Sequence, residues 1–418
     1  NNNNNNNNAT TTTAITSTIP HHVLVESNCL TRYNKLRSAW TPQLISRTLE
    51  STACSSTNLA LFELVDSRND HDDGDNDNDD DTTTSLVERF VLNMLYLELG
   101  GSSSWKHKTG WLDKGHGGSV CHWFGVDCNN AGNVRRIELN NNSLDGILPT
   151  ELGLLSNLGE CKEANSLPLL LQPNAPSTFI VQDLFTVRNN RIEGPIPREI
   201  GQLSKLEFLD MTHNGLTGTL PEELSRLRAL HLLSLEDNFL EGTIPTRLGR
   251  MYSLDIVHLA YNSFTGTIPT EIESLKSLAW LTMSSNSLNG TLPPEIGRLY
   301  KMEAILLDNN RLSGPIPTEI GRLSGLKELD VSQNRLTGNL PTEIGLLTLL
   351  VNLTVFENDL FGFIPRQVCN LWSFDLERFA DSSCLEGSYG GLRCDSITMA
   401  TCCKECNTRT TIHHSPWQ

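Results

Sequence analysis

A pattern of leucine, asparagine, glycine and proline returns every 24 residues through most of this 418-residue chain. One copy, from Leu206 to Leu230, reads LEFLDMTHNGLTGTLPEELSRLRAL and follows the scheme LxxLxLxxNxLxGxIPxxLGxLxxL. A glycine and a proline stand four and seven residues after each asparagine. A fixed period of this length predicts stacked coils that grow in one dimension, so chain length does not set a number of globular domains. The marker asparagines are Asn142, Asn190, Asn214, Asn238, Asn262, Asn286, Asn310, Asn334 and Asn358.

Each residue type in the pattern has a physical reason. The LxxLxL part predicts a short strand with inward leucines, and each fully buried one contributes about 1.5 to 3 kcal/mol. The asparagine amide can donate and accept, so it can satisfy backbone groups of its own coil and of the adjacent one. Glycine permits a tight bend, and proline fixes φ where the chain turns away. A single coil has only its neighbours to pack against, so the array is stable only as a stack.

The array resembles leucine-rich repeat proteins, and its LxGxIP half is similar to the plant extracellular class. This resemblance implies an α/β solenoid, a right-handed horseshoe or superhelix with a concave parallel sheet, a helical N-terminal cap and a Cys-rich C-terminal cap. We expect the array over residues 132–365, with about ten repeats of 24 residues.

One stretch inside the array departs from the pattern. Gly159 to Thr178 reads GECKEANSLPLLLQPNAPST. Asn142 and Asn190 are 48 residues apart, or two periods, so we expect residues 158–181 to form one degenerate coil with Cys161 in the core. The alternative is inserted, translated non-coding sequence whose length fits the period. Either origin predicts a locally distorted segment, because Glu163 cannot be buried unpaired.

The N-terminal region has a different composition. Residues 1–84 contain an Asn/Thr-rich stretch and the acidic run NDHDDGDNDNDDD, which predict disorder and an acidic linker, although the acidic run leaves a calcium loop as an alternative. Residues 85–131 begin with an amphipathic helix that carries Leu86, Phe90, Met94 and Leu97 on one face. This helix, two tryptophans and CHWFGVDC resemble the N-terminal cap of plant-type repeat proteins.

The resemblance implies disulfides in both caps. In the N-terminal cap it implies a Cys121–Cys128 bridge, with two free buried thiols as the alternative; zinc binding through His116 and His122 is a further alternative there. Residues 366–418 hold six cysteines, and the resemblance favours a bridge between Cys369 and Cys384. Zinc held by Cys402, Cys403, Cys406 and a histidine is the alternative in this cap.

The composition of the chain indicates its cellular compartment and excludes some classes of binding partner. The chain has a formal net charge of −17 and no basic stripe, so nothing indicates nucleic-acid binding. Eleven cysteines, clustered towards both ends of the array, favour an oxidising compartment. The sequence contains no run of about 18 apolar residues, so it predicts no membrane span. Because the chain begins with eight Asn, we expect a signal or anchor segment to be missing from it, and we expect a secreted or cell-surface protein.

The sequence indicates a binding function. It contains no GxSxG, HExxH, phosphate-binding loop or kinase signature, so we expect no enzyme and no cofactor. Repeat arrays of this kind offer an extended concave surface, lined by the strand positions between the leucines. The 24-residue register assigns ten candidate ligand-binding residues to it: Phe208, Asp210, His213, Glu236, Ile256, His258, Tyr261, Trp280, Asp308 and Asp330.

The aromatic side chains among these candidates offer contact area, and acidic side chains flank them. This combination would suit a protein, peptide or glycan ligand. The resemblance to receptor-like ectodomains and to polygalacturonase-inhibitor-like proteins implies a recognition module, with a membrane-anchored co-receptor as a further partner. The alternative is a structural or adhesive component of a cell wall or extracellular matrix. Sequons at Asn141, Asn289 and Asn352 are candidate glycosylation sites. The sequence leaves the oligomeric state open.

Overall fold

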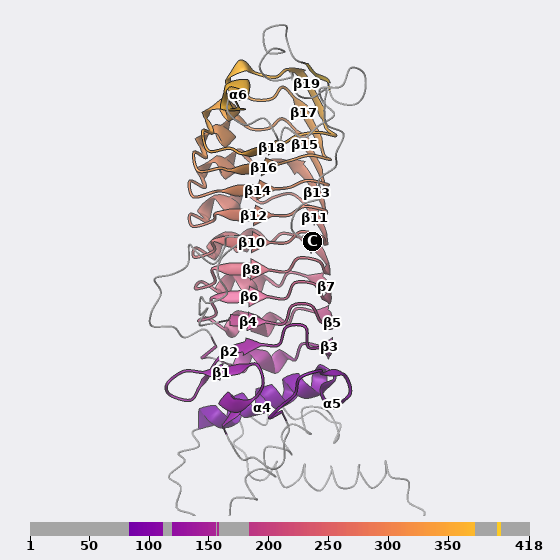
Figure 1. Cartoon of the computed structure of the whole chain (residues 1–418), viewed down its shortest axis with the longest axis vertical. Coiled ribbons are helices and arrows are strands. Elements are labelled where there is room, and N and C mark those ends of the chain that lie inside the picture. Colours follow the sequence, from indigo (N-terminus) through magenta and orange to yellow (C-terminus); the bar gives the residue numbers. More distant parts are fainter. Residues whose placement is uncertain (1–82, 112–118, 156, 159–183, 373–390, 394–418) are drawn as a thin grey trace, which may run out of the picture.

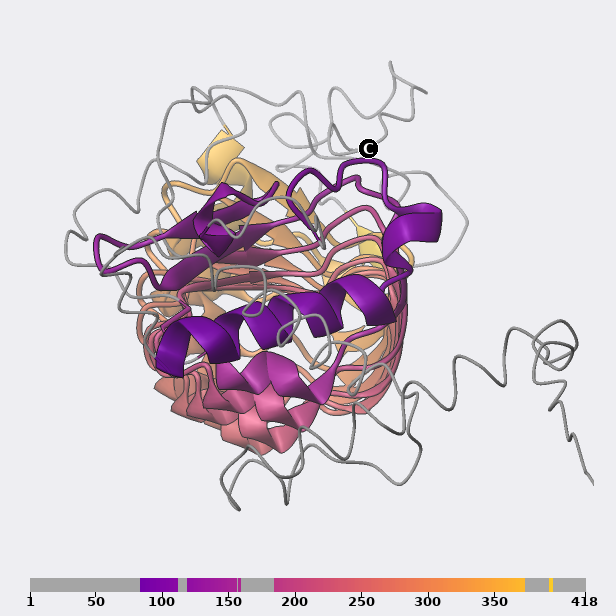
Figure 2. The same cartoon turned by 90° about the horizontal axis from the view of Figure 1, so that it is seen from below.

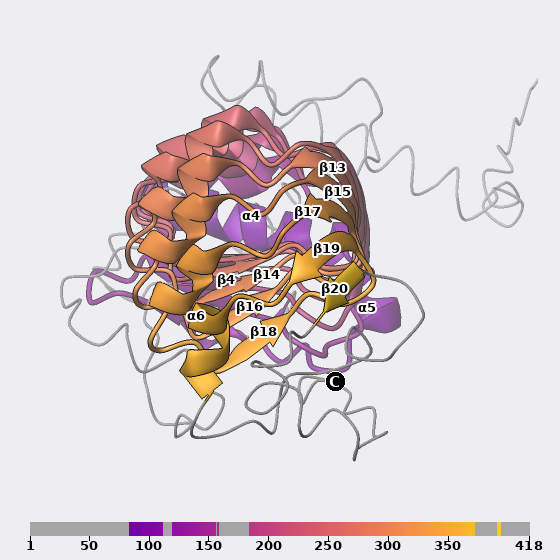
Figure 3. The ribbon, with the colours of Figure 1, turned by 90° about the horizontal axis from the view of Figure 1, so that it is seen from above.

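The protein is a tall stack of coils. The computed structural model describes residues 83–111, 119–155, 157–158, 184–372 and 391–393. Each coil contributes a strand to one sheet, a strand to a second sheet and a short 3-10 helix to the back (Figures 1 and 3). The architecture is the α/β solenoid that the family resemblance implied, and its helical elements on the back are 3-10 turns.

The first sheet carries the strands of the LxxLxL part. Within the described residues it has ten strands in the order β1-β2-β4-β6-β8-β10-β12-β14-β16-β18, parallel except for the β1–β2 pair. Neighbouring strands pair with an offset of one period, as in Ile256 with Trp280. The strands are β1 (Val126–Cys128), β2 (Val134–Glu138), β4 (Leu184–Thr186), β6 (Phe208–Asp210), β8 (Leu232–Ser234), β10 (Ile256–His258), β12 (Trp280–Thr282), β14 (Ala304–Leu306), β16 (Glu328–Asp330) and β18 (Asn352–Thr354).

The second sheet is formed by the LxGxIP part. Its order is β20-β19-β17-β15-β13-β11-β9-β7-β5-β3, all parallel in the described chain. These strands lie beside the first sheet along the whole stack (Figure 1). They are β3 (Asp145–Ile147), β5 (Arg191–Pro195), β7 (Gly215–Thr219), β9 (Phe239–Thr243), β11 (Ser263–Gly266), β13 (Ser287–Thr291), β15 (Arg311–Gly314), β17 (Arg335–Gly338), β19 (Asp359–Phe363) and β20 (Gly391–Arg393).

The back of the stack is a row of 3-10 helices. Each begins directly after a proline whose φ lies between −63° and −70°, the value that the pyrrolidine ring imposes. They are η2 (Thr150–Leu154), η4 (Arg198–Gln202), η5 (Glu222–Arg226), η6 (Thr246–Arg250), η7 (Thr270–Ser274), η8 (Pro294–Arg298), η9 (Thr318–Arg322) and η10 (Thr342–Leu346).

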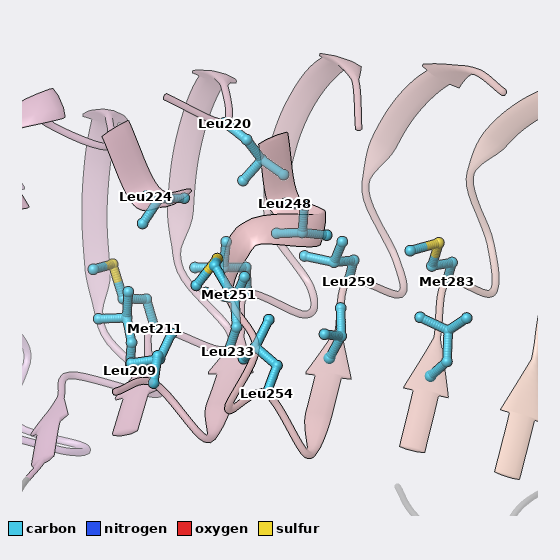
Figure 4. Packing of buried hydrophobic residues seen from close by; sticks show 14 of the residues in the cluster. Leu209, Met211, Leu220, Leu224, Leu233, Leu248, Met251, Leu254, Leu259 and Met283 are labelled. Atoms are coloured by element: carbon cyan, nitrogen blue, oxygen red, sulfur yellow. The ribbon is translucent and has the colours of Figure 1, made fainter. Parts of the chain in front are cut away.

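The core runs up the inside of the stack. Leu209 and Leu233, on neighbouring strands of the first sheet, and Leu224 and Leu248, in the 3-10 helices, are all buried in it (Figure 4). Because every coil repeats this arrangement, the apolar interior is continuous from the first coil to the last.

The marker asparagines connect each coil to the coil before it. The Asn238 Nδ2 donates to the backbone oxygens of Met211, Leu235 and Glu236 at 3.1, 3.1 and 3.2 Å. Its Oδ1 accepts from the backbone N–H of Leu216 at 3.1 Å. Asn262, Asn286, Asn310 and Asn334 repeat this arrangement. The amide therefore satisfies backbone groups that a purely apolar side chain would leave unpaired.

The residue before each marker asparagine has left-handed backbone geometry. Its φ lies between 50° and 56°, a range that non-glycine residues adopt at a cost. This geometry turns the chain from the first sheet towards the second. The residues are Asn141, Asn189, His213, Asp237, Tyr261, Ser285, Asn309, Gln333 and Glu357.

The helix α4 (Thr83–Glu98) lies across the open end of the first coil (Figure 2). Phe90 and Met94, from the predicted face, are buried, but Leu97 is only half-buried while Leu92 and Leu95 are fully buried. The single-face prediction was therefore too narrow, because the helix is covered on more than one side. The Glu88 Oε2 accepts the backbone N–H of Val134, which fixes the helix to the start of β2.

The segment after α4 covers the same end of the stack. It includes α5 (Gly101–Ser104) and η1 (Val120–His122), and a disulfide joins Cys121 to Cys128. The rings of Tyr96, Trp105 and Trp111 pack together, with centroids 5.0 Å apart for the first pair and 4.8 Å for the second. We infer that residues 85–131 serve as the predicted N-terminal cap, since these groups cover leucines that the first coil would otherwise expose.

The prediction of a degenerate coil over residues 158–181 is wrong. Strand β2 pairs directly with β4, and β3 pairs directly with β5, so no coil lies between them. Leu158 donates to the Leu155 oxygen at 3.0 Å, as Leu206 does to Leu203 at 2.9 Å. Leu184 then pairs with Phe208 at the start of the next strand. The normal coil has one residue between these two positions, whereas here residues 159–183 stand between them. This favours the inserted-sequence alternative.

Joining residue 159 directly to residue 184 gives LGLFTVRNN, which matches LxxLxLxxN. The surplus is thus residues 160–183, a length of one period. An insertion of that length keeps the phase of the markers, which is why the sequence pattern alone suggested a coil.

The last coil continues into α6 (Arg366–Cys369) and η11 (Asn370–Trp372), while β20 pairs with β19. The C-terminal cap over residues 366–418 stays a prediction, as does the Cys369–Cys384 bridge, because most of that stretch lies outside the described residues. The acidic run, His116, Cys161 and the cysteines from Cys394 onwards lie outside them too. No helix in the described part is long and apolar enough to span a membrane.

Candidate binding face

The outward side of the first sheet forms a continuous face, which we call the concave face. Strand alternation points one residue of each strand into the core and its two neighbours outward, as Leu281 is buried between Trp280 and Thr282. Because the coils stack in register, outward residues form columns along the solenoid. Asp210, Ser234, His258, Thr282, Leu306 and Asp330 form one such column.

Aromatic residues lie on this face, though less exposed than the sequence suggested. Phe208 and Trp280 are half-buried, and the Phe208 ring lies 6.4 Å from the His231 ring. Tyr261 is 55% exposed and projects from the left-handed turn beyond β10. The prediction of a solvent-facing Ile256 is wrong. It is 3% exposed, because it stands between Leu232 and Trp280 in neighbouring strands.

Three carboxylates gather over β6 and β8, and we call Asp210, Glu236 and Asp237 the N-proximal acidic group. The Arg188 guanidinium lies 3.9 Å from Asp210, and His213 Nδ1 is hydrogen-bonded to Asp237. Burial raises the pKa of the Glu236 carboxyl; the nearby His213 opposes this rise, while Asp237 and Asp210 add to it. The Glu236 carboxylate has no hydrogen bond or ion pair with any described residue.

A second set lies over β14 and β16, and we call Asp308, Glu328 and Asp330 the C-proximal acidic group. Burial raises the pKa of Asp330 to about 6; hydrogen bonds from Ser332 lower it, and the charges of Asp308 and Glu328 raise it. The backbone N–H and hydroxyl of Ser332 donate to Asp330 Oδ1 at 2.9 and 2.6 Å. The other donors are neutral as well, from Ser284 to Asp308 and from Asn352 to Glu328.

Between the two acidic groups the face holds polar atoms without partners. His258 Nε2 and Thr282 Oγ1 are buried and form no hydrogen bond with the described residues. Thr282 is 9% exposed. Burial lowers the pKa of His258 to about 4, against a smaller opposing effect of Asp210. His258 is therefore neutral near pH 7, so one of its ring nitrogens is an acceptor.

The structure places the ten predicted residues on this one face, with Ile256 contributing little surface. The ten candidates chosen from the sequence did not include Asp237 and Glu328, which complete the acidic groups. The same register could have found them, since Asp237 shares a column with His213 and Tyr261. The unpaired atoms of His258 and Thr282 could not be read from the sequence. Within the described residues no cluster of His, Cys, Asp and Glu has the arrangement of a metal site.

The sequon asparagines differ in accessibility. Asn141 and Asn289 are exposed, the latter in the second sheet. Asn352 is half-buried in β18, and its Nδ2 donates to Glu328 Oε1 at 3.2 Å. The structure does not favour a glycan on Asn352, because that nitrogen is already engaged inside the sheet.

Known families and structures support the fold assignment. A family model described as Leucine Rich Repeat matches residues 205–227, 277–299 and 325–347. Among curated proteins, none matches the chain. A crystal structure of a plant ice-binding protein matches with a TM-score of 0.51, and the match covers 73% of this chain and 96% of that protein. Because the two sequences are only 23% identical, this match shows the fold alone.

Two receptor ectodomains from Arabidopsis are similar in sequence and structure. The leucine-rich repeat ectodomain of the membrane receptor kinase GASSHO1/SCHENGEN3, solved in complex with CASPARIAN STRIP INTEGRITY FACTOR 2, is 29% identical with a TM-score of 0.55. The ectodomain of the receptor kinase HAESA, in complex with an N-terminally extended IDA peptide hormone ligand, is 26% identical with a TM-score of 0.51.

Each match covers 69% of this chain, but only 34% of the first ectodomain and 48% of the second. The chain thus spans between a third and a half of their length. Together with the period, the asparagine ladder and the two parallel sheets, these matches show that the chain forms a leucine-rich repeat solenoid similar to the ectodomains of plant membrane receptors.

Proposed function

We propose that this protein is a non-enzymatic recognition module that binds a peptide or protein segment along the concave face. The observation that carries the proposal is the composition of that face. Half-buried Phe208 and Trp280, in strands of the first sheet, and exposed Tyr261, in the turn after β10, lie on the same face as two groups of carboxylates. Rigid aromatic side chains supply contact area at low entropic cost, and carboxylates discriminate charged ligands.

The HAESA ectodomain supports a peptide as the ligand, since that similar array was solved with a peptide hormone bound. We further propose a secreted or cell-surface location, which the similarity to ectodomains of membrane receptors supports. A glycan ligand and a membrane-anchored co-receptor stay predictions. The structural or adhesive alternative stays a prediction as well.

The test uses random peptides displayed on phage and selected against the full chain. We expect the Trp280→Ala, Tyr261→Ala double variant to lose most of the binding of selected peptides without a change in circular dichroism. Tyr252→Ala with Tyr300→Ala is the matched control, since these tyrosines are 54% and 64% exposed away from the strands of the concave face. Equal binding by both double variants would contradict the proposal.

A further inference from the structure

The two acidic groups stand on one line along the solenoid. Asp210 and Asp330 occupy the same outward column, with Ser234, His258, Thr282 and Leu306 between them. From the middle of β6 and β8 to the middle of β14 and β16 there are four strand spacings. At about 4.8 Å per spacing, the centres of the two groups are roughly 19 Å apart.

The C-proximal acidic group has no basic side chain as a partner among the residues that the structure describes. Asp308, Glu328 and Asp330 accept hydrogen bonds from neutral donors, and no described basic side chain forms an ion pair with them. In the N-proximal acidic group Glu236 also has no such partner. Half-buried carboxylates that repel one another are costly without a counter-charge, and a bound cation would relieve that cost at both positions.

The surface between the groups points to a peptide rather than to two separate cations. It is apolar over Trp280 and Leu306, and it contains the unpaired His258 Nε2 and Thr282 Oγ1. Buried polar atoms normally have partners, so these two are candidates for partners supplied by a ligand. A peptide main chain carries a donor and an acceptor at nearly every residue and can lie along the column.

Resting on the proposed function, we propose that the ligand is an extended peptide segment with two basic residues about six positions apart and apolar residues between them. The spacing follows from the roughly 19 Å between the acidic groups and about 3.3 Å per extended residue. One basic side chain binds the N-proximal acidic group and the other binds the C-proximal group. The apolar middle of the segment packs on Trp280.

The experiment sequences the peptides that displayed libraries yield on the full chain, and then compares synthetic peptides with arginines six or three positions apart. We expect enrichment of basic pairs near the longer spacing and tighter binding of the six-position peptide. We also expect Glu236→Gln and Asp330→Asn each to weaken that peptide about tenfold, the loss of one charge-assisted contact. The matched controls are Glu193→Gln and Glu241→Gln, exposed carboxylates of the second sheet, which should leave affinity unchanged.

The outcomes separate this inference from the proposed function. Selected peptides that lack basic pairs, yet lose binding in the Trp280→Ala, Tyr261→Ala variant, would overturn the inference and leave the proposed function intact. A six-position peptide no tighter than the three-position peptide would overturn it equally. If the selected peptides bind every concave-face variant as tightly as they bind the parent chain, both the inference and the proposed function are overturned.

Discussion

The Asn190 side chain joins two coils that are 48 residues apart in sequence. Its Oδ1 accepts the backbone N–H groups of Asn142 and Leu144, both at 3.0 Å. In the regular coils the corresponding bond spans 22 residues, as from Leu216 to Asn238. The contact that normally links successive coils therefore bypasses residues 160–183.

Deletion of residues 160–183 is expected to preserve the fold. The deletion restores LxxLxLxxN across the junction and removes a long connection, whose closure costs roughly 3 kcal/mol more than the one-residue link of a normal coil. We expect an unchanged circular dichroism spectrum and a higher Tm in thermal unfolding. Deletion of residues 208–231 is the length-matched control: it removes one regular coil and should lower the Tm, because array stability sums over coils. A comparable loss in both deletions would show that residues 160–183 contribute a coil.

Asn238→Ala tests the asparagine ladder. The substitution removes donors to three carbonyls and the acceptor for Leu216 N–H, in a side chain that is 6% exposed. We expect the free energy of unfolding in urea to fall by roughly 2 to 4 kcal/mol, since buried backbone groups lose their partners. Thr217→Ala, at an exposed position of β7, should change it by less than about 0.5 kcal/mol. A small effect of Asn238→Ala would indicate that water replaces the amide.

The Tyr261 position should show a conflict between stability and binding. Tyr261 has φ of 52°, and Asn309 occupies the equivalent position two coils later with φ of 53°. Asparagine tolerates this geometry better than tyrosine. We expect Tyr261→Asn to raise the free energy of unfolding by about 1 kcal/mol while it weakens peptide binding. The reciprocal Asn309→Tyr should lower stability by a similar amount. Urea titrations of both variants measure this, and a loss of stability in Tyr261→Asn would contradict the explanation.

The raised pKa of the Asp330 carboxyl predicts that this residue contributes to stability in a pH-dependent way. Its folded-state pKa, about 6, lies above the ordinary value of 3.8, so the folded protein holds this proton more tightly than the unfolded chain. The contribution is fully present below pH 4 and is lost as pH rises through 6, by up to about 3 kcal/mol. An asparagine can still accept both bonds from Ser332. We therefore expect Asp330→Asn to be more stable than the parent at pH 7.5 and equal to it near pH 4.

Urea unfolding at the two pH values checks this prediction, with Glu241→Gln as the exposed control. A gain of equal size at both pH values would show that the effect is not the titration of Asp330. The same variant should bind the doubly basic peptide more weakly, so the carboxylate would be retained for binding at a cost in stability.

The sequence by itself determined the repeat, the first strand of each coil and the columns of the concave face, whereas the second strand of each coil came from the structure. These follow from a fixed period, because identical spacing forces equivalent residues into the same position of every coil. Phe208, Asp210, Trp280 and Asp330 could therefore be assigned to one surface from their numbers alone. The pairing of Cys121 with Cys128 was also suggested before the structure, because the family resemblance implies a disulfide between these two cysteines.

Only the tertiary structure decided which coil stacks on which and what each side chain meets there. The insertion of residues 160–183 has the length of one period, so phase could not distinguish it from a coil, whereas the pairing of β2 with β4 does. Ile256 and Tyr261 were both candidate binding residues in the sequence, yet Ile256 is 3% exposed within the sheet and Tyr261 projects from a left-handed turn. Periodicity fixes the direction of a side chain, but its exposure, its partners and its pKa depend on the neighbours that packing brings beside it.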